Sequence, residues 1–200
     1  MNPFCRQGRL ALTLTLAAAL LGGCQSSATV STSEGYRPAA ESARNPLEAQ
    51  RLTAEAVPLM ASDPAKAEQL LQQALTADLF HGPAHNNLGV LMLSAQPPKL
   101  YEAAHEFEWA GKLMPGHPDP QHNLAMTLEA AARYDDAIAS YRLALETRPG
   151  HLPSLQALTS LQLRLDKADD HADAALKTIA MQGTTPQWRQ WAADRLRNAK

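Results

Sequence analysis

One pattern of side chains, small then large then small, returns about every 34 residues and constrains the fold more than any other feature. The members of each copy lie at positions i, i+4 and i+7, which an α-helix places on one stripe of its surface. The two small residues let a neighbouring helix approach around the large one. The copies, spaced 36, 34 and 35 residues apart, are Ala67, Leu71 and Ala74; Ala103, Phe107 and Ala110; Ala137, Tyr141 and Ala144; and Ala172, Leu176 and Ile179. This period predicts an all-α solenoid of stacked helical hairpins.

Prolines and capping side chains mark where the helices should begin. Four pairs join a side-chain acceptor to a proline, which has no amide hydrogen to leave unpaired: Asn45-Pro46, Asp63-Pro64, Asp119-Pro120 and Thr185-Pro186. Pro58 instead lies inside a helical stretch and should kink or shorten it. These marks predict helices near 46–61, 64–78, 83–95, 99–114, 120–131, 135–147, 153–165, 169–181 and 186–198. The helices make about four hairpins and a C-terminal capping helix.

The N-terminus has the pattern of a processing signal. Arg6 and Arg9 precede a 12-residue apolar run, which is shorter than the roughly 20 residues that span a bilayer. Residues 21–24, Leu-Gly-Gly-Cys, resemble the lipobox of bacterial lipoproteins. That resemblance implies that residues 1–23 are a signal peptide, that Cys24 is lipidated, and that lipid anchors the chain to a membrane. Gln25 in place of Asp resembles the rule that sends lipoproteins to the outer membrane, facing the periplasm. The alternative is an ordinary secretory peptide with a coincidental cysteine.

The residues between the predicted lipidated cysteine and the first predicted helix differ in composition from the rest of the chain. Residues 24–45 are rich in serine and threonine and lack apolar periodicity, so we expect a flexible tether there. The two arginines lost with residues 1–23 change the formal net charge from −2 to −4. Because the remaining basic residues are scattered, nucleic acid is disfavoured as a partner. Cys24 would be the only cysteine left, which excludes an internal disulfide.

Two central repeats resemble those of tetratricopeptide repeat proteins. The first shows Asn87-Leu88-Gly89 before its triplet and Pro115 after it, and the second shows Asn123-Leu124-Ala125 and Pro149 in the same places. The resemblance implies a right-handed α-solenoid with units 48–81, 82–117, 118–151 and 152–185 and a capping helix at 186–198, all within a domain of residues 46–200. It also implies a concave groove, lined by the first helix of each unit, which binds extended or helical peptides.

The family's groove positions correspond to a mixed surface in this sequence. Asn87 and Asn123 match an asparagine that in some members grips a ligand's backbone, while Ala157 and Thr53 interrupt the series. Alternatively, both asparagines only pair with neighbouring turns. Because Lys and Arg are mostly missing from these positions, a ligand held by its C-terminal carboxylate is disfavoured. The implied groove residues are Asn86, Asn87, Val90, Leu93, His122, Asn123, Met126, Glu129, Gln156, Ser160, Leu163 and Arg164.

Seven histidines raise the question of a metal site. His81, His117 and His151 occupy equivalent positions in successive units, so two helix layers at roughly 8–10 Å per contact should hold them well over 10 Å apart, too far to share an ion. The run that starts at His105 has Trp109 where a zinc-protease signature needs its second histidine. We therefore expect no cofactor, no metal site and no catalytic residue. Trp188 and Trp191 should seal the last hairpin.

These observations predict a non-enzymatic, lipid-anchored scaffold that binds a protein or peptide partner in the bacterial envelope. In plan it resembles the tetratricopeptide lipoproteins of type IV and Flp/Tad pilus assembly, which suggests a role in pilus or secretion-apparatus assembly. One alternative is an envelope enzyme, or an enzyme subunit, with a histidine metal site. Another is a homo-oligomer formed by stacking of the repeat ends.

Overall fold

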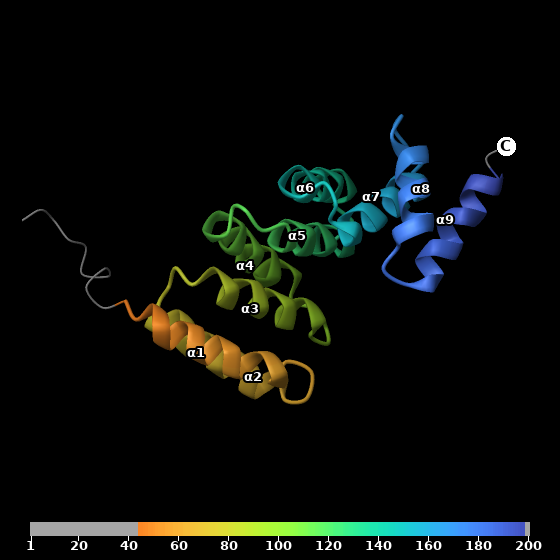
Figure 1. Ribbon diagram of the computed structural model, residues 1–200. Coiled ribbons are helices and arrows are strands. Elements are labelled where there is room, and N and C mark those ends of the chain that lie inside the picture. Colours follow the sequence, from red (N-terminus) through yellow and green to blue (C-terminus); the bar gives the residue numbers. More distant parts are fainter. Residues whose placement is uncertain (1–43, 199–200) are drawn as a thin grey trace, which may run out of the picture. The chain divides into compact units, whose positions relative to one another are not determined.

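The computed structural model describes residues 44–198, which lie within one compact unit of residues 38–200. In this range the chain forms α-helices, one short 3₁₀ helix and no strand (Figure 1). The elements are α1 (Pro46–Ala56), η1 (Val57–Leu59), α2 (Pro64–Ala77), α3 (Gly82–Ser94), α4 (Leu100–Leu113), α5 (Asp119–Ala130), α6 (Tyr134–Thr147), α7 (Leu152–Arg164), α8 (Ala172–Gln182) and α9 (Pro186–Asn198). The all-α prediction is confirmed for the described residues. The predicted signal peptide, Cys24 and nearly all of the tether lie outside them.

Consecutive helices pair into hairpins along the chain. The most extensive contacts join α1 to α2, α3 to α4, and α5 to α6. At the C-terminal end the pattern changes, because α8 packs more extensively against α9 than against α7. Leu176 and Ile179 of α8 form a buried cluster with Ala192 of α9, and Trp188 and Trp191 pack against it. The two tryptophans therefore cover the last helices as predicted.

The repeated triplets form the core of the hairpins. Every member of the first three triplets is buried, and so are Leu176 and Ile179 of the fourth. Gly89 shows why a very small residue stands opposite a large one: a Cβ atom added there would lie 2.7 Å from the ring of Phe107. The close approach of α3 and α4 at this point requires that space.

Three of the four predicted capping pairs begin their helices as expected. Asn45 accepts a hydrogen bond from the amide of Glu48, and Asp63 accepts one from the amide of Lys66, each at 3.1 Å. The Thr185 hydroxyl accepts from the amide of Trp188 at 3.3 Å. Asp119 is not a cap as predicted: α5 begins at Asp119 itself, and no side chain caps this helix. The prediction for Pro58 is confirmed, because α1 ends just before it and a 3₁₀ turn follows.

The folded unit begins slightly before the first helix. Arg44 donates two hydrogen bonds to the buried carboxylate of Asp78, at 2.8 and 3.1 Å. The amide of Asn45 also donates to the carbonyl of Ala77, at 2.8 Å. These contacts fasten the end of the predicted tether to the C-terminal end of α2. Among the described residues, no helix is long and apolar enough to cross a bilayer.

Candidate functional site: a pocket between α5, α7 and α9

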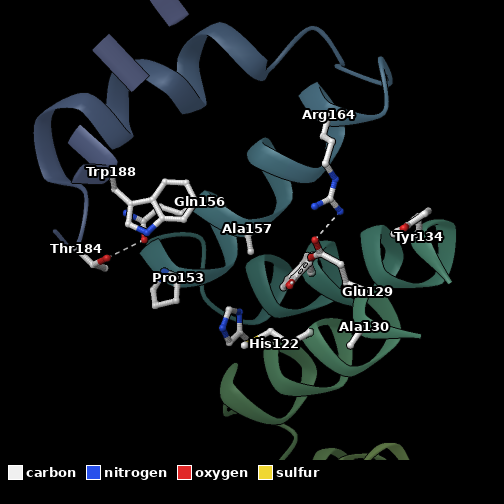
Figure 2. Close-up of a pocket in the computed structure, with 12 residues that line it drawn as sticks. His122, Glu129, Ala130, Tyr134, Pro153, Gln156, Ala157, Arg164, Thr184 and Trp188 are labelled. Carbon is white, nitrogen blue, oxygen red and sulfur yellow. Dashed lines mark hydrogen bonds and ion pairs between the residues drawn. The ribbon is translucent and has the colours of Figure 1, made fainter. Parts of the chain in front are cut away.

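A pocket of about 630 Å³ opens where α5, α6 and α7 meet the start of α9. Figure 2 shows α5 and α7 contributing most of its wall, with Trp188 closing one side. Its volume falls within the range of roughly 300–1,000 Å³ that is typical of ligand sites. The lining residues are His122, Met126, Glu129, Ala130, Tyr134, Tyr141, Pro153, Gln156, Ala157, Arg164, Thr184 and Trp188.

The structure brings some of the predicted groove residues together and leaves others outside this pocket. His122, Met126, Glu129, Gln156 and Arg164 line it. The three predicted asparagines do not line it but are linked by hydrogen bonds. Three further residues are half-buried on α3 and α7 and do not line it: Val90, Leu93 and Ser160. The last, Leu163, packs against the buried cluster between α8 and α9.

The asparagines form an amide group that joins α3 to α5. Asn123 Nδ2 donates to Asn86 Oδ1 at 3.0 Å, and Asn86 Nδ2 donates to Asn87 Oδ1 at 3.5 Å. Each of the three is half-buried. The described residues offer no partner to Asn87 Nδ2 or to Asn123 Oδ1, so one donor and one acceptor remain at the two ends of this group. An extended peptide backbone carries both complementary groups.

Charge in the pocket is compensated within the chain. Glu129 on α5 accepts a hydrogen bond from Arg164 on α7 at 2.7 Å and another from the Tyr141 hydroxyl at 3.2 Å. The guanidinium of Arg164 also lies over the ring of Tyr134, 5.6 Å from its centroid. Burial, together with the charge of Glu129, raises the pKa of the Tyr141 hydroxyl, so this group stays a neutral donor. The pocket thus offers no uncompensated charge to a ligand.

A chain of polar contacts leads away from His122, which lines the pocket. His151 places Nε2 3.2 Å from Asp119 and Nδ1 2.8 Å from the Ser154 hydroxyl. His122 Nδ1 lies 3.1 Å from the same hydroxyl, and His117 Nδ1 lies 3.3 Å from Asp119. The expectation that His117 and His151 lie far apart is therefore wrong. Helix layers separate the backbones, but both imidazoles reach the same carboxylate.

Two catalytic interpretations of this chain of contacts fail on the geometry. The order Asp119, His151, Ser154 is that of a serine-hydrolase relay, but Ser154 is 0% exposed and His122 occupies its other side. No group of three or more His, Cys, Asp or Glu side chains within residues 44–198 is arranged to hold a metal ion. Burial, with a smaller effect of His151, lowers the pKa of His122 to about 4, so its ring is uncharged at neutral pH.

Several lining residues were not predicted from the sequence. Tyr134 and Tyr141 belong to the second helix of their hairpin, whereas the predicted groove used only first helices. Ala157 stands where a third asparagine would continue the series, and its small side chain leaves room for the pocket. Trp188 was predicted only to cover the last hairpin. It packs edge-on against Trp191, with centroids 5.3 Å apart, and also lines the pocket.

Comparison with known proteins finds matches to the fold but none to the sequence. No protein-family model matches the sequence, and no curated protein matches it. Many solved structures, however, resemble the described hairpins.

Three such structures are similar over most of the solenoid. The structure of Pseudomonas aeruginosa PilF is 22% identical, covers 76% of this chain and 67% of its own, and has a TM-score of 0.60. The first tetratricopeptide domain of Spaghetti (RPAP3), bound to an HSP90 peptide, is 14% identical, with coverage of 62% and 98% and a TM-score of 0.57. The Sgt2 tetratricopeptide domain from Aspergillus fumigatus is 22% identical, with coverage of 64% and 90% and a TM-score of 0.56. The described part of the chain thus has the all-α solenoid fold of tetratricopeptide repeat proteins.

Proposed function

We propose that this protein is a non-enzymatic scaffold that binds an extended peptide or protein segment in the groove formed by α3, α5 and α7. The observation that carries the proposal is the open pocket beside the amide group, because together they offer an apolar cavity and unpaired backbone-like hydrogen-bonding groups. The RPAP3 domain, which shares the fold, is described with a bound HSP90 peptide. An acidic C-terminus is a poor ligand for the present pocket, since its one cation, Arg164, is already paired with Glu129.

The experiment compares partner recovery by two matched variants of the protein. One replaces four groove residues by alanine and should lose a partner that the wild type recovers from envelope membranes: Asn86, Asn87, His122 and Asn123. The control also replaces three amides and one histidine, all exposed on α2, α4 and α8, and should keep the partner: Gln72, Gln73, His105 and Gln182. Equal recovery by both variants would remove the groove from the proposal.

The second part of the proposal is that Cys24 carries a lipid that holds the scaffold at the outer membrane, facing the periplasm. The lipobox-like residues 21–24 support this part, and the resemblance in plan to pilus-assembly lipoproteins supports service in a pilus or secretion apparatus. Cys24→Ala should abolish acyl labelling and release the protein from the membrane fraction, or leave an unprocessed precursor. The circular dichroism of the folded domain should be unchanged, because Cys24 lies outside the described helices, the first of which begins at Pro46. Persisting acyl labelling in the variant would contradict the assignment.

A further inference from the structure

The donor and acceptor roles along the chain of contacts from Asp119 to His122 follow from the carboxylate at one end. Asp119 is a carboxylate and can only accept, so the His151 nitrogen that faces it, Nε2, must carry a hydrogen. Burial is the main cause that lowers the pKa of His151, so the ring is neutral near pH 7 and has only one N–H. Its Nδ1 is consequently a lone-pair acceptor, and the Ser154 hydroxyl donates to it over 2.8 Å.

The remaining contact then fixes the state of His122. Ser154 has a single hydroxyl hydrogen, which is directed to His151, so its oxygen can only accept from His122. His122 Nδ1 must therefore carry the hydrogen, and His122 Nε2 must hold a lone pair. Within residues 44–198, Nε2 has no hydrogen-bond partner, while the His122 side chain lines the pocket (Figure 2).

The rest of the pocket selects for an uncharged occupant. Its charged side chains, Glu129 and Arg164, are paired at 2.7 Å and neutralise each other. Much of the remaining wall is apolar, with contributions from Met126, Ala157 and Trp188. Burying a charged group against such a wall without a partner would cost more than the contact returns.

We propose that the pocket takes an uncharged, extended peptide segment that donates a backbone N–H to His122 Nε2 and inserts a large apolar side chain against Met126 and Trp188. In this arrangement Ser154 is a positioning residue, which acts by holding His122 in one tautomer. The inference rests on the proposed peptide-binding function and specifies the chemistry of the partner.

The tautomer can be tested without any ligand, on a chain of residues 25–200 that contains the whole compact unit. Side-chain ¹⁵N spectra should show His122 with Nδ1 protonated and Nε2 bare at neutral pH. Ser154→Ala should release that preference, whereas Ser160→Ala, a half-buried serine on the same helix, should leave it unchanged. A wild-type spectrum with hydrogen on Nε2 would overturn the inference, as would a tautomer that does not respond to Ser154→Ala.

Binding can be tested with small probes of defined chemistry. N-acetyl-phenylalaninamide and its leucine analogue should shift the Trp188 indole resonance saturably, and should leave that of Trp109 on α4 unchanged. An analogue with methylated amide nitrogens should bind about fivefold more weakly, because it lacks the donor for a hydrogen bond of ordinary net strength. The glutamate analogue should bind less tightly than the phenylalanine probe.

A pair of methionine variants locates the binding site. Met126→Glu should abolish the shift, whereas Met181→Glu, at a position 77% exposed on α8, should not. Glutamate binding as tight as phenylalanine binding, or no saturable shift with any probe, would overturn the assigned chemistry. The scaffold function is judged separately, by recovery of the partner with the groove variant.

Discussion

A buried ion pair between α3 and α4 yields a prediction whose direction changes with pH. His85 is 4% exposed, with Nδ1 2.7 Å from Glu106 and Nε2 2.8 Å from the carbonyl of Leu79. Both partners are acceptors, so both ring nitrogens carry hydrogen and the ring is charged. Burial disfavours that charge, but the hydrogen bonds to Glu106 and Leu79 outweigh it and raise the pKa of His85 above its ordinary value.

The cost of His85→Ala follows from what remains behind. Hydrogen bonds to charged groups contribute roughly 1.5–3 kcal/mol, and removing one partner of a buried pair costs roughly 3–5 kcal/mol. Because the side chain of Glu106 is 16% exposed and water can reach it, we expect the lower end, about 3 kcal/mol. The raised pKa makes this contribution complete below the unfolded value of about 6.5. It declines as the pH rises through the higher folded value.

Urea unfolding of the wild type and His85→Ala at about pH 6 and about pH 9 measures this contribution as a difference in unfolding free energy. The difference should be larger at the lower pH. Glu106→Gln keeps an acceptor near the ring but removes its charge, so it should reduce the pH dependence. A difference that stays constant or grows between the two conditions would show that His85 is neutral in the folded protein.

Three further predictions test other contacts by the same unfolding measurement. The wild type should lose stability as the pH falls from about 6.5 towards about 4, because unfolded His122 gains a proton that the folded ring resists; His122→Gln should lose less. Gly89→Val places atoms against the ring of Phe107 and should destabilise by about 1–3 kcal/mol, and Phe107→Leu should recover part of that loss. Arg44→Ala leaves the buried Asp78 carboxylate without its guanidinium and should cost about 1–3 kcal/mol, less at acid pH where the carboxyl is protonated.

Local chemistry explains why the helices could be predicted closely. The triplet spacing determines which stripe of each helix is buried, and the proline pairs determine where helices start. The end of α1 near Pro58 was predicted from local chemistry too, because a proline inside a helix removes a backbone hydrogen bond whatever the helix packs against. Asp119 had the same local signal as the true caps, but its carboxylate binds His117 and His151, and a sequence motif does not reveal such a competing partner.

The pocket could be predicted only in part. His122, Met126 and Glu129 on α5 were predicted from the resemblance to tetratricopeptide repeats, whose groove is lined by the first helix of each unit. Trp188 does not, since the position of α9 depends on how its apolar face packs against α8 rather than on the 34-residue period. The tautomer of His122 depends similarly on Asp119, three contacts away through Ser154 and His151, and sequence position gives no indication of that connection.

Because α8 packs more extensively against α9 than against α7, a ligand in the pocket would change the stability of the C-terminal end of the chain. One wall of the pocket, Trp188, belongs to this terminal pair, while the facing wall belongs to α5 and α7. In a linear array each element is stabilised mainly by its neighbours, so the terminal pair has the fewest restraints against local opening. An occupant that contacts both walls would link helices that are not neighbours in the array. Because it binds only when the terminal pair is packed in place, its binding free energy would stabilise α8 and α9 against local opening. Amide hydrogen exchange in α8 and α9 should therefore slow in proportion to pocket occupancy, while exchange in α1 and α2 stays constant.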